Sequence, residues 1–392
     1  MRPAVSSQIR EVQDHLGPMA RFFGETIPSL RAAFGDAICD FAAGNPQEGA
    51  LEPYVDALRR WVEPREPDWF AYKTSEEPAR RVIAASLRDY LDVPFDPADI
   101  FITNASIAAI AVTLRTICDP GDEVIIISPP HFLYGALILS VGARPVSVRI
   151  DESTFDLDVP AIRAAITERT RAVIVNTPHN PTGKIFPRET LEDLAAVLTE
   201  ASERQPTFLL SDEAYNRILF DDRRFTSPAA IYPRTFLIYS YGKVLLAPGQ
   251  RIGYAALAPD MPERDEIRGA MLVSQVATGF AVANALLQHA LADLDPLSVD
   301  VKMLQGRRDR LVEALRGMGY EFHVPEAAFY LMPRSPIDDD RRFCDSLAEG
   351  GVIAMPGSFL ELPGYFRLSV TATDDMIERS LPVFARAIER AG

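Results

Sequence analysis

The residues most clearly suited to catalytic chemistry lie between Ser240 and Tyr254. This stretch places Lys243 in a turn of small residues, with the Ser240 hydroxyl before it and the Arg251 guanidinium after it. A lysine that forms a Schiff base with an aldehyde needs such a setting, because its amine must be desolvated and deprotonated near neutral pH. The serine and the arginine would anchor a phosphate beside it. The alternative is an exposed loop that carries two ordinary cations.

Three apolar runs that precede this lysine in the sequence each end in polar residues. They lead, in chain order, to Asn180, to Asp212 and Tyr215, and to Lys243. Runs rich in β-branched residues or leucine are typical of buried parallel strands. Because ligands bind outside the carboxyl ends of the strands in open α/β sheets, we expect these four side chains to converge on one rim.

The elements that must position this rim alternate between strand and helix along the chain. Such alternation predicts a parallel sheet that is covered by helices on both faces. We expect a helix followed by an irregular arm over 8–36, and one long helical stretch over 281–316 that leads into a second domain. A length of 392 residues also suits two domains that share a cleft.

The composition excludes several classes of function. The hydrophobic content of 47% and charged content of 24% are ordinary for a globular protein. A formal net charge of −15 disfavours nucleic acids and anionic membranes as partners. The cysteines Cys39, Cys118 and Cys344 match no metal-ligand spacing and suggest a reducing compartment. The first residues lack the apolar core of a signal peptide, and we expect a cytoplasmic protein.

The order of these motifs resembles that of the fold type I pyridoxal-phosphate enzymes, specifically the class I/II aminotransferases. The motifs are Asn-Pro-Thr-Gly at Asn180, Asp-Glu-x-Tyr at Asp212, and Ser-x-x-Lys at Ser240, and the resemblance runs from about Gly44 to Arg367. It implies a large α/β domain with a mostly parallel seven-stranded sheet flanked by helices, plus a smaller α+β domain. We expect the large domain over 45–285 and the small one over 1–44 and 286–392.

The resemblance implies pyridoxal 5′-phosphate (PLP) as the cofactor, bound covalently by Lys243. Asp212 would keep the ring nitrogen protonated, although an aspartate after a strand also serves as a turn or N-cap residue. Tyr215 and Asn180 would hydrogen-bond the phenolic oxygen. Asn180 could otherwise be only the turn former of its Asn-Pro-Thr-Gly motif.

The phosphate would bind at a predicted helix start that contains Ala105 and Ser106, together with Ser240 and Arg251. The family usually has glycine in place of Ala105, so this alanine must either avoid a positive φ or accept some strain. Tyr72 matches a tyrosine that reaches the phosphate from a neighbouring subunit, which implies a homodimer with shared active sites. The alternative for Tyr72 is a packed aromatic residue near a helix start.

Substrate and ring contacts come from further residues. His131 stands where the family usually stacks Trp, Tyr or Phe on the cofactor; imidazole can stack and also carry a proton, or His131 is structural. Tyr134 belongs to the pocket or to the core. Arg367 resembles the arginine that holds the substrate α-carboxylate as a fork, the alternative being a strand-edge salt bridge. Gly44 and Asn180 would complete the carboxylate site.

The function that this resemblance implies is transfer of the amino group of an L-α-amino acid to a 2-oxo acid. Lys243, Asp212 and Tyr215 would carry the catalysis, with Lys243 as general base and acid, and no metal is expected. No lysine or arginine lies near Ser106, so a donor restricted to aspartate or glutamate is not indicated. The same scaffold also supports lyase, synthase and amino-acid oxidase chemistry, and a non-catalytic sensor domain is a third possibility.

Overall fold

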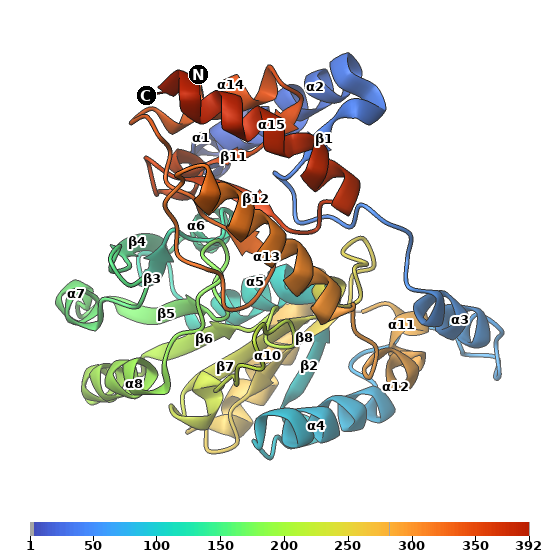
Figure 1. Cartoon of the computed structure of the whole chain (residues 1–392). Helices are drawn as coiled ribbons and strands as arrows, with labels where there is room; N and C mark the ends of the chain where they lie inside the picture. The colour runs from blue at the N-terminus through green and yellow to red at the C-terminus, as the bar shows by residue number, and fades with distance from the viewer. Residues whose placement is uncertain (1–3, 282, 392) are drawn as a thin grey trace.

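A seven-stranded sheet lies at the centre of the computed structural model, which describes residues 4–281 and 283–391 (Figure 1). The strand order is β2-β8-β7-β6-β5-β3-β4. β8 is antiparallel to both of its neighbours, and the other neighbouring strands are parallel. The prediction of a mostly parallel seven-stranded sheet is therefore confirmed. The strands are β2 (Ile100–Thr103), β3 (Glu123–Ser128), β4 (Arg144–Arg149), β5 (Thr170–Asn176), β6 (Phe208–Asp212), β7 (Thr235–Ser240) and β8 (Gly253–Leu257).

Helices cover both faces of this sheet. In β3, Val124 and Ile126 belong to one buried cluster, whereas Ile125 and Ile127 belong to another, because successive side chains of a strand point to opposite faces. The first cluster is completed by α5 (Ala105–Ile117), α6 (Leu133–Ser140) and α10 (Arg264–Ala277). The opposite face is covered by α7 (Val159–Ala165), α8 (Arg188–Ser202) and α4 (Glu77–Leu91).

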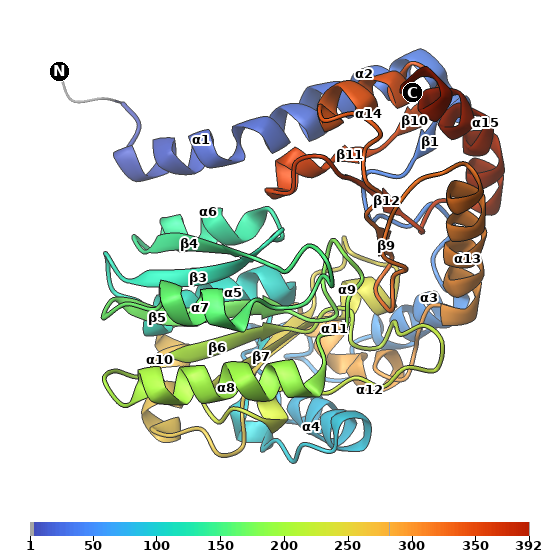
Figure 2. The ribbon, with the colours of Figure 1, turned by 60° about the vertical axis from the view of Figure 1, so that its left-hand side comes forward.

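A smaller region of helices and short strands lies beside the large sheet (Figures 1 and 2). Its core joins Phe41, from the first part of the chain, to Phe343, Phe366 and Phe384 from the last part. This matches the expected smaller α+β domain, while the boundaries at residues 45 and 285 stay predictions. Its elements are β1 (Cys39–Asp40), β9 (Tyr330–Leu331), β10 (Val352–Ile353), β11 (Met355–Pro356), β12 (Phe366–Ser369), α2 (Ile27–Phe34), α13 (Val301–Gly317), α14 (Asp340–Ala348) and α15 (Asp374–Ala391).

Residues 7–37 are helical, so the expectation of an irregular arm before residue 36 is wrong. α1 (Ser7–Arg21) continues through a π-helical turn over Phe22–Thr26 into α2. In this turn a backbone hydrogen bond spans five residues instead of four, from the Ile27 N–H to the Phe22 carbonyl, and the helix continues through it. Figure 2 shows α1 extending from the small region across α6 of the large one, where Gln8 donates to the Leu139 carbonyl at 3.0 Å.

The expectation of a single helical stretch over 281–316 is also wrong. The structure has α11 (Ala285–His289), α12 (Leu291–Leu294) and then α13, with a break between the last two. Pro296 lies in the break and lacks the N–H group that a continuous helix would use. Asp300 then starts α13 anew by accepting from the backbone of Lys302 and Met303. α11 and α12 pack against α3 (Glu52–Trp61) at the edge of the large region.

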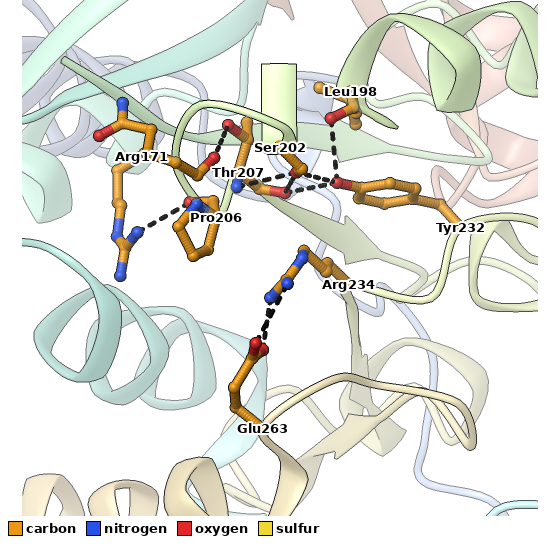
Figure 3. Close-up of polar contacts among 9 residues, drawn as sticks. Arg171, Leu198, Ser202, Pro206, Thr207, Tyr232, Arg234 and Glu263 are labelled. Atoms are coloured by element: carbon orange, nitrogen blue, oxygen red, sulfur yellow. Dashed lines mark hydrogen bonds and ion pairs between the residues drawn. The ribbon is translucent and has the colours of Figure 1, made fainter. Parts of the chain in front are cut away.

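Polar contacts stabilise the end of the sheet at which β6 and β7 begin (Figure 3). The Tyr232 hydroxyl donates to the carbonyl of Thr207 at 2.7 Å and to that of Leu198 at 3.3 Å. Arg234 pairs with Glu263 at 2.7 Å. Tyr232 thereby satisfies the loop carbonyl of Thr207 just before β6 and links that loop to α8 through Leu198, while the Arg234–Glu263 pair joins two side chains. The candidate site residues lie at the opposite, carboxyl ends.

None of the helices within residues 4–281 and 283–391 combines the length and the apolar character that a membrane crossing requires.

Candidate active site

One cavity at the carboxyl ends of β5, β6 and β7 brings most of the predicted site residues together. The predicted residues that line it are Ser106, His131, Tyr134, Asn180, Asp212, Tyr215, Ser240, Lys243 and Arg251. Arg367 joins this set through a hydrogen bond to Asn180. Gly44 and Ala105 lie next to other site residues, as described below. Tyr72 does not line the cavity, and its side chain is 94% exposed.

Lys243 reaches the cavity from α9 (Tyr241–Val244), a single turn of helix that directly follows β7. A Cβ on the preceding Gly242 would lie 2.9 Å from Pro248, so only glycine fits this close turn. The Lys243 ammonium lies 5.6 Å from the ring centroid of Tyr215 and 5.8 Å from that of Phe329. Within the described part of the chain, no carboxylate pairs with it. Its amine is therefore available for covalent chemistry.

Asp212 is buried at the end of β6, where it accepts a 2.5 Å hydrogen bond from the Tyr134 hydroxyl. It also accepts from the backbone of Ala214 at 3.3 Å, so the turn-forming role exists alongside any role toward a ligand. Burial raises the pKa of Asp212, while the hydrogen bonds and Lys243 favour its charged form. Tyr134 thus lines the cavity, and its contact there is with Asp212.

Asn180 and Tyr215 lie next to each other, with the Asn180 amide 3.5 Å from the Tyr215 hydroxyl. The backbone of Asn180 donates to the Asn176 side chain at 2.7 Å, and Asn176 donates to the Asp212 carbonyl at 2.7 Å. Asn176 therefore couples the ends of β5 and β6. Sequence reasoning did not select it, although its place as the last residue of an apolar run is the same signal that marked Asp212.

Ala105 and Ser106 open α5 beside β8, where helix-start amides favour an anion. Ala105 has φ of 67°, in the left-handed region. The sequence allowed either a negative φ or strain, and the structure has the strained form, which costs about 1–2 kcal/mol. A Cβ on Gly253 would lie 2.8 Å from Ala105, so this glycine permits the close approach of β8. Ser240 and the exposed Arg251 line the same cavity.

His131 follows β3 and faces the cavity with its ring against Phe132, at a centroid distance of 4.8 Å. Enclosure of the ring by protein, together with the positive charges of Lys243 and Arg367, lowers the pKa of His131 to about 3. The Leu133 backbone donates to its Nδ1 at 3.4 Å, which leaves the proton on Nε2. His131 is thus a neutral, planar group near neutral pH and not a proton carrier there.

Arg367 lies on β12 and is only 4% exposed. It donates to Asn180 Oδ1 at 3.0 Å and to the Ala42 carbonyl at 2.7 Å, while its Nε has no partner among the described residues. No carboxylate pairs with Arg367 within residues 4–281 and 283–391, which contradicts the strand-edge salt bridge. A buried cation without an anion is costly, so this position favours an anionic ligand.

Tyr330 packs against Arg367 and was not identified as a site residue from the sequence. The Arg367 guanidinium lies 4.2 Å from its ring centroid. A Cβ on Gly44 would lie 2.2 Å from the Tyr330 hydroxyl, so only glycine allows the two segments to meet. In sequence, the apolar run around Tyr330 predicts a buried strand and gives no signal that its hydroxyl faces Gly44.

The comparisons with known proteins agree with this geometry. A sequence model of the family described as aminotransferase class I and II matches residues 37–383. The aspartate/prephenate aminotransferase of Thermus thermophilus is 32% identical over 359 residues, covering 89% of this chain and 90% of that protein. A probable N-succinyldiaminopimelate aminotransferase of Mycobacterium tuberculosis is 33% identical, covering 72% of each chain.

Solved structures show the same fold. An aminotransferase from Eubacterium rectale superposes with a TM-score of 0.87 at 28% identity, covering 99% of this chain and 97% of that one. Aspartate aminotransferase from Thermus thermophilus with maleate gives 0.83 at 27% identity, covering 99% and 100%. The relatives carry aminotransferase names, so the lyase, synthase and oxidase alternatives are not favoured. The chain belongs to the class I and II aminotransferase family, which implies PLP as cofactor, and it is an enzyme that transfers amino groups.

Proposed function

We propose that this aminotransferase binds PLP in the cavity at the ends of β5, β6 and β7 and uses it on L-α-amino acids and 2-oxo acids. The observation that carries the proposal is the buried Arg367, which lacks a carboxylate partner in the described chain and donates to the cavity residue Asn180. The charges of Arg367 and Lys243 both act on His131 and on Tyr330, so a carboxylate bound at Arg367 would lie near the unpaired amine of Lys243. That pairing of groups suits a substrate that carries both an amine and a carboxylate.

The residues present fit PLP. Lys243 supplies the amine for its aldehyde, and Asp212 supplies a buried carboxylate for its ring nitrogen. Tyr215 and Asn180 offer donors for its phenolic oxygen, and His131 offers a neutral planar face. The phosphate would take the helix start and hydroxyls around it. These phosphate residues are Ala105, Ser106, Ser240 and Arg251. When bound, PLP supplies a ring that accepts electrons from the substrate.

The protein side chains then divide the work between binding and proton transfer. With PLP bound, the Lys243 amine would serve as the general base that takes the proton from the substrate Cα and as the general acid that returns it. Asp212 keeps its charge toward the ring nitrogen, with Tyr134 holding its orientation by the 2.5 Å hydrogen bond. Arg367, with the backbone at Gly44, holds the α-carboxylate so that the substrate cannot rotate.

A second copy of this chain would complete the site. Tyr72 is 94% exposed, and the neighbouring Phe70 and the α10 residues Val273 and Val276 are exposed as well. Exposed large apolar side chains are surface that a protein partner can bury. We therefore propose a homodimer in which Tyr72 reaches the phosphate region of the partner subunit. The free cysteines agree with a reducing compartment, and we propose the cytoplasm.

Borohydride reduction of the purified protein, reconstituted with PLP, tests the central claim. We expect a visible absorbance band that borohydride removes, leaving a pyridoxyl group that mass spectrometry places on Lys243. The matched control is Lys243→Ala, which should keep the circular dichroism spectrum of the wild type and carry no label. A label on another lysine, or none at all, would refute the assignment. A screen of amino acids with a 2-oxo acid acceptor then tests transamination directly.

A further inference from the structure

The ring of Tyr330 supports Arg367, the arginine that donates to the cavity residue Asn180. Tyr330 lies at the start of β9, is 3% exposed, and has its ring centroid 4.2 Å from the guanidinium carbon of Arg367. The face of an aromatic ring attracts a cation, and the attraction grows when water is excluded. The ring therefore limits how far the guanidinium can tilt.

The hydroxyl of Tyr330 points to the segment that contains Gly44. The position of a Cβ on Gly44 would be 2.2 Å from this oxygen, which places the oxygen against the backbone of that residue. Tyr215 donates to the Tyr330 hydroxyl at 3.5 Å, the outer limit of a hydrogen bond. No acceptor for the proton of Tyr330 itself is present in the part of the chain that the structure describes. That proton is free for a ligand.

Arg367 alone does not saturate a carboxylate. Two of its nitrogens each already donate to the protein, to Asn180 and to Ala42, and Nε is the nitrogen without a partner in the described chain. A carboxylate has two oxygens that accept about four hydrogen bonds. A further donor beside Arg367 would thus find an acceptor, and the Tyr330 hydroxyl lies on that side, between Arg367 and the Gly44 backbone.

We propose that Tyr330 is a substrate-recognition residue whose hydroxyl donates a hydrogen bond to the α-carboxylate, while its ring holds Arg367 in position. This inference rests on the proposed function, because it assumes that Arg367 binds the substrate carboxylate. The charges agree with it: burial opposes ionisation of Tyr330, yet Lys243 and Arg367 hold its pKa below the ordinary tyrosine range. A more acidic hydroxyl is a stronger donor to an anion.

Two substitutions separate the hydroxyl from the ring. Tyr330→Phe removes the hydroxyl alone, and Tyr330→Leu removes the hydroxyl and the ring. Tyr320→Phe is the matched control, because Tyr320 is also buried and donates its hydroxyl to a carbonyl, that of Phe384, at 2.9 Å. The PLP-loaded variants would be titrated with L-alanine and with ethylamine, which differ by the carboxylate, and binding followed by the change in cofactor absorbance.

We expect Tyr330→Phe to weaken L-alanine binding roughly ten- to a hundredfold, the effect of losing one hydrogen bond to a charged group, and to leave ethylamine binding unchanged. Tyr330→Leu should weaken L-alanine further, and Tyr320→Phe should match the wild type with both probes. Wild-type affinity of Tyr330→Phe for L-alanine, or an equal loss for both probes, would overturn the inference.

The phenol absorbance at 295 nm gives a second measurement that does not depend on the bound cofactor. The wild type should contain one phenol that ionises at lower pH than the others, and Tyr330→Phe should lack it. If the phenol that Tyr330→Phe lacks ionises at the same pH as the others, the claim that Lys243 and Arg367 lower the pKa of this hydroxyl is overturned. If Lys243 carries no borohydride label, the proposed function fails; if the label is present but Tyr330→Phe binds like the wild type, this inference alone fails.

Discussion

Replacement of Glu213 by glutamine should make the stability of this protein less sensitive to pH. Glu213 follows Asp212 and is fully buried. Its carboxylate accepts from Ser227 at 2.6 Å, from Ser211 at 2.9 Å and from Asn216 at 3.2 Å. Burial outweighs these donors and raises its pKa from 4.5 to about 7, with the nearby charge of Asp212 adding to the shift.

The sign of the effect follows from where the proton is held. Between about pH 4.5 and 7 the folded protein keeps the Glu213 proton that the unfolded chain has released, so the free energy of unfolding falls as the pH rises through this window. A shift of this size corresponds to about 3 kcal/mol. Glutamine cannot ionise, and the Asn216 Oδ1, which has no partner in the described structure, can accept from its amide after a small rotation.

Urea unfolding at pH 5 and pH 8 measures this difference, with every protein at one concentration so that association does not differ. The measured quantity is the free energy of unfolding of Glu213→Gln minus that of the wild type. From pH 5 to pH 8 this difference should increase by about 3 kcal/mol, reduced by the part of the titration that is already complete at pH 5. Glu189→Gln, on the exposed face of α8, is the control and should follow the wild-type dependence. A Glu213→Gln protein with the same pH dependence as the wild type would show that Glu213 is ionised throughout.

Three further substitutions test the proposed site. Arg367→Lys should lower kcat/KM with the natural donor by roughly thirty- to a thousandfold, because lysine cannot form the fork, and it should leave the spectrum of the bound cofactor nearly unchanged; unchanged kinetics would place carboxylate recognition elsewhere. Gly44→Ala should raise KM, because its Cβ would lie 2.2 Å from the Tyr330 hydroxyl and force the two segments apart; a wild-type KM would show that this corner does not bind substrate. Tyr72→Phe should weaken PLP binding while sedimentation still reports a dimer, and unchanged PLP affinity would remove Tyr72 from the site.

The central sheet and the cavity at its rim could be predicted from the sequence, because both depend on local patterns. The apolar runs of β5, β6 and β7 are distinct, and parallel strands bring the residues that follow them to one edge. Asn180, Asp212 and Lys243 therefore meet without any knowledge of long-range contacts. Arg367, in contrast, could be placed only through the family resemblance, since it is far from the others in sequence.

The parts that failed depend on contacts between distant segments. The hydroxyl of Tyr330 matters because Gly44 and Arg367 pack against it, and nothing near Tyr330 in sequence encodes either neighbour. The continuous path of α1 into α2 depends on its packing across α6, which a local pattern does not contain. The break before α13 was readable in principle from Pro296 and the capping residue Asp300.

Three energetically costly features of this fold lie at the proposed site, and they support a function there without reference to relatives. Ala105 has a strained backbone, Arg367 is buried without a carboxylate in the described chain, and Asp212 is buried with a raised pKa. Strain and unpaired charge persist where function requires them. A phosphate at the start of α5, a carboxylate at Arg367 and a protonated ring nitrogen at Asp212 would each offset one of these costs. One cofactor and one amino acid supply all three groups, and their binding should therefore stabilise the folded chain.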